Sequence, residues 1–341
     1  MSLTLPTVNA RDVVGLLMWD AFRCRLKLYA LNCITWTNGL ASFISWSDIS
    51  LGVATSSRKW VMIVCMTDTT KIEVDGIEFE VRRRGRGLPL LVIHGWSADH
   101  RYMMADIEPN FHESSGWQRI YFDLPGHGNT VAPDWLNNQT QMFEILGKFV
   151  EQVIGDQKFC VIGNSYGGYL SLGLVRKMPH RLLGAALLVP DLPDDLNNRQ
   201  TTDAHTIVED MSLFGNLQSD EQWIPLGLVE HSQYALDEIR AHDMPGYRAS
   251  DDALLERLNN NYLLPIEVRS AGVPFAGPSL IALGHQDATV GYERQMQLLP
   301  EFPRATLAVV DMAGHYLGRV ERPKIFNSLV RDWIQRVEIS L

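Results

Sequence analysis

Residues 159–168 read Phe-Cys-Val-Ile-Gly-Asn-Ser-Tyr-Gly-Gly, and this stretch decides the fold. Its first four residues are apolar and two of them are β-branched, which predicts a buried strand. Apolar residues then recur at helical spacing and predict a helix over 166–178. Ser165 therefore lies in a sharp turn between a strand and a helix.

The two glycines around Ser165 indicate why the turn can be so tight. A Cβ atom at Gly163 or Gly167 would collide with a neighbouring strand or helix. The strained turn would lift the Ser165 hydroxyl clear of the sheet, above a helix N-terminus that favours developing negative charge.

A Gly-x-Ser-x-Gly turn between a strand and a helix resembles the nucleophile elbow of the α/β-hydrolase superfamily. From about residue 67 to its end, the chain resembles the serine-nucleophile, cap-bearing branch of that superfamily. The resemblance implies an α/β-hydrolase fold, with a mostly parallel sheet of about eight strands flanked by helices and an inserted helical cap. Epoxide hydrolases and haloalkane dehalogenases of this fold carry an aspartate nucleophile instead, so the serine sets this chain apart from them.

The bulk composition is that of an ordinary soluble protein. The chain has 341 residues, of which 46% are hydrophobic and 21% charged, and it can bury a large core. Its net charge of −10 argues against nucleic acid or an anionic membrane as a partner. The four cysteines show no metal-ligand or disulfide spacing, which favours a reducing, cytoplasmic setting. We expect a small-molecule substrate and neither a cofactor nor a metal, while the oligomeric state stays open.

Residues 1–65 differ in composition from the rest. They hold three of the four cysteines and four of the nine tryptophans, so we place a boundary near Met66. Their longest apolar run, 13–19, is too short to span a bilayer. A basic amphipathic helix around 10–31 is one interpretation. We favour another, an extension outside the fold with no packed structure, following a start codon assigned too early, and assign it no function.

The rest of the chain is predicted to form an α/β core over 66–190 and 278–341, and residues 191–277 interrupt this core. Alternating residues around Asp75-Gly76 predict a β-hairpin. Alternation of buried strands with helices predicts a parallel sheet with right-handed crossovers. The expected strands are 91–93, 120–122, 159–162, 182–190, one beginning at 279, and 307–310, and the expected helices are 141–154, 166–178 and 323–337.

The resemblance also implies a catalytic triad. Ser165 is the nucleophile, Asp287 follows the seventh strand in a Gly-x-x-Asp turn, and His315 follows the last strand in a Gly-His pair. This chain order is the one that the fold requires. His315 would take the proton of Ser165, and Asp287 would hold the imidazole tautomer. Asp191, at the end of the sixth strand, is the rival acid, and we favour Asp287.

The same resemblance places the oxyanion hole at two backbone amides. One is the N–H of Trp96, after the His94-Gly95 turn, and the other is the N–H of Tyr166. Losing one such donor costs about 3 kcal/mol of barrier. His94 itself is expected to brace the loop.

A second turn, over 123–128, reads Asp-x-Pro-Gly-x-Gly and resembles the family's turn after its fourth strand. We expect Asp123 to accept backbone hydrogen bonds there, and His127 to lie at the surface.

About 85 residues, 191–277, are too many for a loop and predict a helical cap that shapes the substrate pocket and excludes water. The cap candidates for that pocket are Trp223, His231, Tyr234 and Tyr247, although each residue type is more often core or surface.

The pattern favours a serine hydrolase that cleaves an ester or related acyl bond of a small molecule. The Gly-Asn-Ser-x-Gly-Gly elbow also resembles that of hydrolases that cleave a C–C bond of ring-fission diketones. A hydrolase-fold ligand sensor with slow turnover and a cofactor-free perhydrolase or lyase are further alternatives. Labelling by a fluorophosphonate separates an enzyme from a sensor.

Overall fold

The computed structural model describes residues 33–37, 40–44, 49–56, 59–66, 68–112, 115–193, 201, 203, 206–270 and 272–341. The chain divides into two compact units, Met1–Met66 and Thr67–Leu341. In the first unit the backbone forms two antiparallel pairs that sequence analysis did not predict. They are β1 (Cys33–Thr37) with β2 (Leu40–Ile44), and β3 (Ile49–Ser56) with β4 (Lys59–Met66). The amphipathic helix considered for 10–31 lies outside the described residues.

The second unit is built on one eight-stranded sheet with the order β12-β11-β10-β9-β7-β8-β6-β5. Its strands are β5 (Asp68–Val74), β6 (Ile77–Arg84), β7 (Leu88–Ile93), β8 (Trp117–Tyr121), β9 (Phe159–Asn164), β10 (Leu182–Leu188), β11 (Ser279–Gly284) and β12 (Ala305–Val310). Only the pairs β5–β6 and β6–β8 are antiparallel. The expected α/β-hydrolase fold, with a mostly parallel sheet of about eight strands, is confirmed.

The hairpin predicted at Asp75-Gly76 is also confirmed. Val74 pairs with Ile77 across a two-residue turn. Both turn residues have positive φ, 52° at Asp75 and 78° at Gly76, the conformation that matches the twist of the flanking strands.

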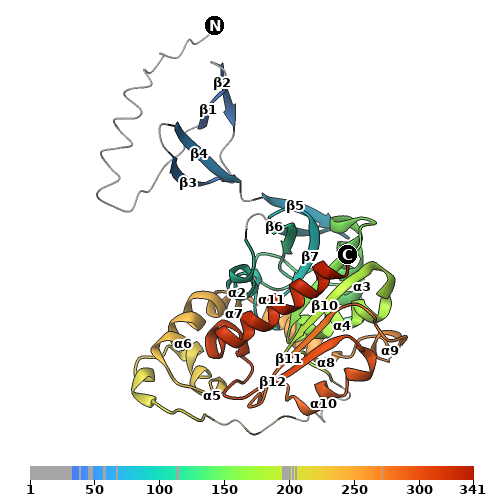
Figure 1. The fold of residues 1–341 in the computed structure, drawn as a ribbon. Helices are drawn as coiled ribbons and strands as arrows, with labels where there is room; N and C mark the ends of the chain where they lie inside the picture. Colours follow the sequence, from blue (N-terminus) through green and yellow to red (C-terminus); the bar gives the residue numbers. More distant parts are fainter. Residues whose placement is uncertain are drawn as a thin grey trace. The chain divides into compact units, whose positions relative to one another are not determined.

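Helices flank both faces of the sheet (Figure 1). Four of these helices are α2 (His100–Ile107), α3 (Gln139–Ile154), α4 (Tyr166–Lys177) and α11 (Pro323–Ile339). Sequence analysis predicted α3, α4 and α11 and missed α2, which is short. Single turns of 3-10 helix lie at η1 (Glu108–Asn110), η2 (Pro179–Arg181), η3 (Met211–Phe214), η4 (Ser219–Glu221) and η6 (Leu299–Glu301).

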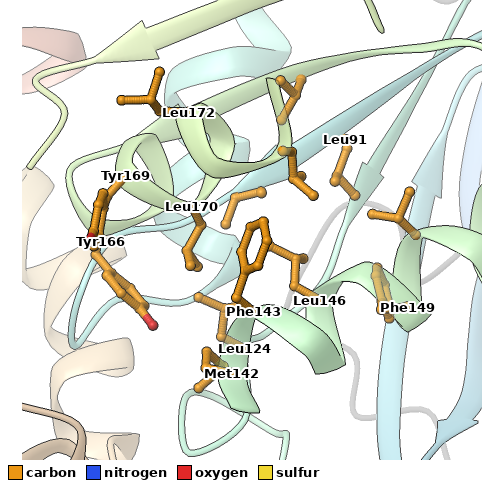
Figure 2. Packing of buried hydrophobic residues seen from close by; sticks show 14 of the residues in the cluster. Leu91, Leu124, Met142, Phe143, Leu146, Phe149, Tyr166, Tyr169, Leu170 and Leu172 are labelled. Carbon is orange, nitrogen blue, oxygen red and sulfur yellow. The ribbon is translucent and has the colours of Figure 1, made fainter. Parts of the chain in front are cut away.

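Successive side chains of β9 pack into different hydrophobic cores, because the side chains of a strand alternate between the two faces of the sheet. Val161 packs in the cluster that contains residues of α3 and α4. Cys160 and Ile162 pack in the cluster that contains residues of α2 and α11. Figure 2 shows part of the first cluster, where Phe143 and Leu146 of α3 lie close to Leu170 of α4. Burial on both faces explains the continuous apolar run that precedes Ser165.

Between β10 and β11 the described residues 206–270 form short helices, and we call this segment the helical insertion. It contains α5 (Ile224–Gly227), α6 (Gln233–Glu238), the π-helical turn η5 (Ile239–Asp243), α7 (Met244–Ala249), α8 (Asp252–Asn260) and α9 (Ile266–Arg269). Its small core includes Phe214, Leu236 and Ile239. Val320 joins that core from the π-helical turn η7 (Leu317–Glu321), which follows β12, and a last short helix, α10 (Glu293–Met296), follows β11.

No helix in the described part of the chain is both long enough and apolar enough to cross a bilayer.

Candidate active site

Ser165 occupies a strained turn between β9 and α4. Its φ of 54° and ψ of −115° lie outside the ordinary regions for a residue with a side chain. The surrounding backbone holds it there: its N–H donates to the Leu188 carbonyl at 2.9 Å, and its carbonyl accepts from Tyr169 and Asp191 at 3.0 and 3.1 Å. Strain at a residue so firmly held is typical of a functional position.

The glycines on each side of Ser165 allow close approach of the backbone. A Cβ atom on Gly163 would lie 2.1 Å from the Gly167 carbonyl oxygen, and one on Gly167 would lie 2.3 Å from the Ile93 carbonyl oxygen. Backbone atoms cannot move aside cheaply, so neither position can carry a side chain without displacing the turn.

We therefore expect Gly163→Ala to lower the free energy of unfolding by about 1–3 kcal/mol, because the added methyl overpacks the turn. Urea denaturation measures the change. Gly147→Ala is the matched control: Gly147 lies within α3 and a Cβ there would meet nothing within 4 Å. The control should stabilise the protein by about 0.5–1 kcal/mol. Equal stability of the two variants would contradict the assignment of Gly163 to a close contact.

Ser165, His315 and Asp287 form one continuous chain of hydrogen bonds. The Ser165 Oγ lies 2.9 Å from His315 Nε2, and His315 Nδ1 lies 2.8 Å from Asp287 Oδ2. The other carboxylate oxygen of Asp287 accepts from the amides of Thr289 and Val290 at 2.9 and 3.0 Å. Asp287 is fully buried, so the loop after β11 fixes its carboxylate toward the imidazole.

Burial and nearby carboxylates act in opposite directions on the pKa of His315. Burial is the largest single influence and opposes the imidazolium form, but the charge of Asp287 and its hydrogen bond, with smaller contributions from the charges of Asp191 and Glu321, together raise the pKa of His315 above its usual 6.5. The raised pKa makes His315 a better proton acceptor toward the Ser165 hydroxyl.

Asp191 lies elsewhere in the hydrogen-bond network. Its Oδ2 accepts from the Tyr262 hydroxyl at 2.7 Å, whereas His315 has Asp287 at hydrogen-bond distance. The structure thus brings together the three residues expected for a triad, whereas Asp191, the rival acid, is hydrogen-bonded to Tyr262.

The loop after β7 lies against Ser165. A Cβ on Gly95 would be 3.4 Å from that of Ser165, and Gly95 and Trp96 line the same cavity as the serine. The Trp96 amide donates no hydrogen bond to any described residue. The Tyr166 amide belongs to the first turn of α4, whose N–H groups have no acceptor within the helix. Both expected donors are therefore on the backbone that surrounds the serine.

His94 braces this loop. Its Nε2 accepts from the Leu124 amide at 2.9 Å, so the proton is on Nδ1, which donates to the Gly95 carbonyl at 2.8 Å. Asp123 accepts backbone hydrogen bonds from His100 at 2.8 Å and Asn129 at 3.0 Å, as predicted.

The expectation that His127 lies at the surface is wrong. His127 is fully buried, with its ring against those of His94 and Trp96. Burial lowers its pKa to about 3, so the ring is neutral. A polar turn sequence gives no sign that the turn folds inward over other aromatic rings.

A cavity of about 80 Å³ opens at Ser165 and His315. Of the four insertion residues suggested from sequence, Trp223 and Tyr247 line it. The other two do not. His231 is buried against the Pro225 carbonyl at 3.0 Å, and the half-exposed Tyr234 donates to the Arg319 carbonyl at 3.1 Å.

Sequence reasoning missed two of the three tyrosines and the carboxylate of the cavity wall. Tyr102 comes from the unpredicted helix α2, Asp243 from the end of η5, and Tyr316 directly follows His315. Only Tyr316 could have been found, from its place beside the expected histidine.

Among the described residues, Asp99, His100 and Asp123 form a buried group with potential metal-ligand atoms within 4.8 Å of one another. Each of the three side chains already has a protein partner. Asp99 caps α2 and pairs with Arg101, while His100 Nδ1 lies 2.8 Å from Asp123 Oδ1. These contacts give the group a structural role beside the loop that follows β7.

The sheet order and the serine at the strand-to-helix turn are together those of an α/β-hydrolase. Residues 90–329, more than half of the chain, match the model of the Alpha/beta hydrolase family. The chain belongs to this family.

Individual relatives differ in the reactions for which they are named. A 2-hydroxy-6-oxo-6-(2'-aminophenyl)hexa-2,4-dienoic acid hydrolase of Metapseudomonas resinovorans is 25% identical over 278 residues, covering 78% of this chain and 90% of that protein. A pimeloyl-[acyl-carrier protein] methyl ester esterase of Legionella pneumophila (strain Lens) is 30% identical over 100 residues, 29% of this chain and 37% of that protein. The crystal structure of an alpha/beta superfamily hydrolase from Oenococcus oeni PSU-1 is similar in fold, with a TM-score of 0.69 and 24% identity over 76% of this chain and 96% of that one.

Proposed function

We propose that the chain is a serine hydrolase that cleaves an ester or related acyl bond of a small molecule through an acyl-enzyme. The hydrogen-bond chain from Ser165 Oγ through His315 to Asp287, at 2.9 and 2.8 Å, carries the proposal. A serine hydroxyl is a weak nucleophile unless a base removes its proton, and this arrangement supplies the base and the group that orients it.

In the proposed reaction, His315 Nε2 takes the Ser165 proton as Oγ attacks the substrate carbonyl carbon. The carbonyl oxygen gains negative charge and accepts hydrogen bonds from the amides of Trp96 and Tyr166. The imidazolium, held by Asp287, gives its proton to the leaving group, and an acyl-enzyme forms. Water activated by the same histidine then releases the acid.

A fluorophosphonate probe tests this proposal because it reacts with an activated serine. We expect the wild-type protein to be labelled on Ser165 and the Ser165→Ala protein to remain unlabelled, as measured by intact mass and peptide mapping. A folded wild-type protein that the probe does not label would overturn the proposal and favour the ligand sensor.

Hydrolysis of a C–C bond is the second candidate. The similarity to the Metapseudomonas resinovorans hydrolase, over most of both chains, supports it, and the same triad could serve both reactions. Initial rates with p-nitrophenyl esters of increasing chain length, beside those with a ring-fission diketone, separate the two. A diketone preferred over every ester in kcat/KM would make C–C cleavage the activity.

A further inference from the structure

The cavity at Ser165 has a carboxylate in its wall. Asp243 is the last residue of η5 in the helical insertion, and it lines the cavity together with Ser165 and His315. The residue is 8% exposed. A carboxyl group this deeply buried loses its hydration, so its position needs compensating partners.

Arg319 is its partner, but this guanidinium is shared. Asp243 Oδ2 accepts from Arg319, as does Asp106 at 3.0 Å, and Glu238 lies 3.1 Å from the same guanidinium. Three carboxylates thus surround one cation, and negative charge is in excess. The second oxygen of Asp243, Oδ1, accepts no hydrogen bond from any described residue.

The rest of the cavity wall is suited to a cation. Trp223 stacks on Tyr316 with ring centroids 6.1 Å apart and lies 5.8 Å from the ring of Tyr247, and all three line the cavity. Aromatic faces attract ammonium groups. In the described part of the chain, no lysine or arginine lines this cavity. An anionic group would therefore meet a carboxylate with no lysine or arginine in the described wall to pair with it.

We infer that Asp243 is a specificity-determining residue that selects substrates whose short acyl chain ends in a protonated amine. This inference rests on the proposed serine hydrolase activity and names its substrate class. An ammonium group in the cavity can pair with the Asp243 carboxylate and lie against the aromatic wall. The volume of about 80 Å³ is well below that of typical ligand pockets, which restricts the acyl chain to a few atoms.

The ionisation of Asp243 gives the selection a pH dependence. Burial raises the pKa of Asp243 to about 7, with Arg319 opposing the rise and Asp106 and Glu238 adding to it. The other titratable groups that interact with it are the phenols of Tyr102 and Tyr316, which are neutral at these pH values. The carboxylate form, which favours a cation, predominates above pH 7, so the preference for an amine should weaken as the pH falls below 7.

A matched pair of esters tests the inference. The p-nitrophenyl esters of 3-aminopropionate and butyrate differ only in a terminal ammonium or methyl group. The mono-p-nitrophenyl ester of succinate ends in a carboxylate at the same end of the acyl chain. At pH 8 we expect the amine ester to have a kcat/KM about 10- to 100-fold above that of the butyrate ester, and the succinate ester to be the poorest. Asp243→Asn should abolish the preference for the amine.

Glu238→Gln is the control, because it removes a charge from the same guanidinium without altering the cavity wall. It should keep the amine preference. A wild-type enzyme that prefers butyrate or succinate, or an Asp243→Asn enzyme with an unchanged preference, would overturn the inference while leaving the serine hydrolase proposal intact.

Calorimetric binding to the Ser165→Ala protein, with the methyl esters of 3-aminopropionate and butyric acid, gives a readout that needs no turnover. If no ester is hydrolysed but the amine ester binds at least tenfold more tightly and Asp243→Asn removes the difference, the proposed function fails and the inference stands. Equal binding of the two esters would count against the inference.

Discussion

The Ser165→Ala protein is expected to lose about 10⁶-fold in kcat toward its best ester. The physical reason is that His315 Nε2, 2.9 Å from Ser165 Oγ, would have no hydroxyl to deprotonate, so no acyl-enzyme could form. Steady-state kinetics with a chromogenic ester measures the loss. Hydrolysis above the uncatalysed rate by about 10³- to 10⁴-fold should survive, because the oxyanion donors and the cavity remain.

Ser97→Ala is the matched control for this result. Ser97 lines the same cavity, but its hydroxyl makes no hydrogen bond to His315. Its loss should change kcat less than tenfold. A Ser165→Ala protein that keeps more than one hundredth of the wild-type kcat would remove this serine from the mechanism.

The elbow could be predicted from sequence because its determinants are local. A run of residues buried on both sheet faces, a glycine on each side of Ser165, and a helical repeat after it all lie within 159–178. The predicted strand and helix agree with β9 and α4 to within two residues. The partners Asp287 and His315 follow apolar runs in the same way, so the parallel sheet gathers them at one edge.

The wall of the cavity could not be predicted, since it depends on contacts between distant segments. Arg319 pairs with Asp106, 213 positions away, and with Asp243, 76 positions away. The short helix that carries Asp106 has a weak apolar pattern, and the helical insertion consists mostly of helices of four to nine residues. Such elements owe their positions to tertiary packing more than to their own sequence periodicity.

Replacing Asp287, the proposed acid of the triad, should have the second largest effect on kcat. We expect Asp287→Asn to lower kcat by about 10⁴-fold, because an amide at this position no longer holds the proton on His315 Nδ1 and does not stabilise the imidazolium. Asp191→Asn is the matched control, since Asp191 is also buried and accepts a hydrogen bond from Tyr262 at 2.7 Å. The kcat of Asp191→Asn should fall less than tenfold. Steady-state kinetics of both variants gives the comparison.

The pH profile distinguishes loss of the acid from general disruption of the site. His315 must be neutral to act as base, so wild-type kcat/KM should fall as the pH drops through its pKa, which lies above 6.5. Burial alone lowers that pKa, and Asp287 provides the largest opposing effect. The acidic limb of Asp287→Asn should therefore move to lower pH, while that of Asp191→Asn should move less, because the charge of Asp191 raises the same pKa by a smaller amount. If Asp191→Asn instead shifts the limb further and loses the larger share of kcat, Asp191 is the acid that orients His315.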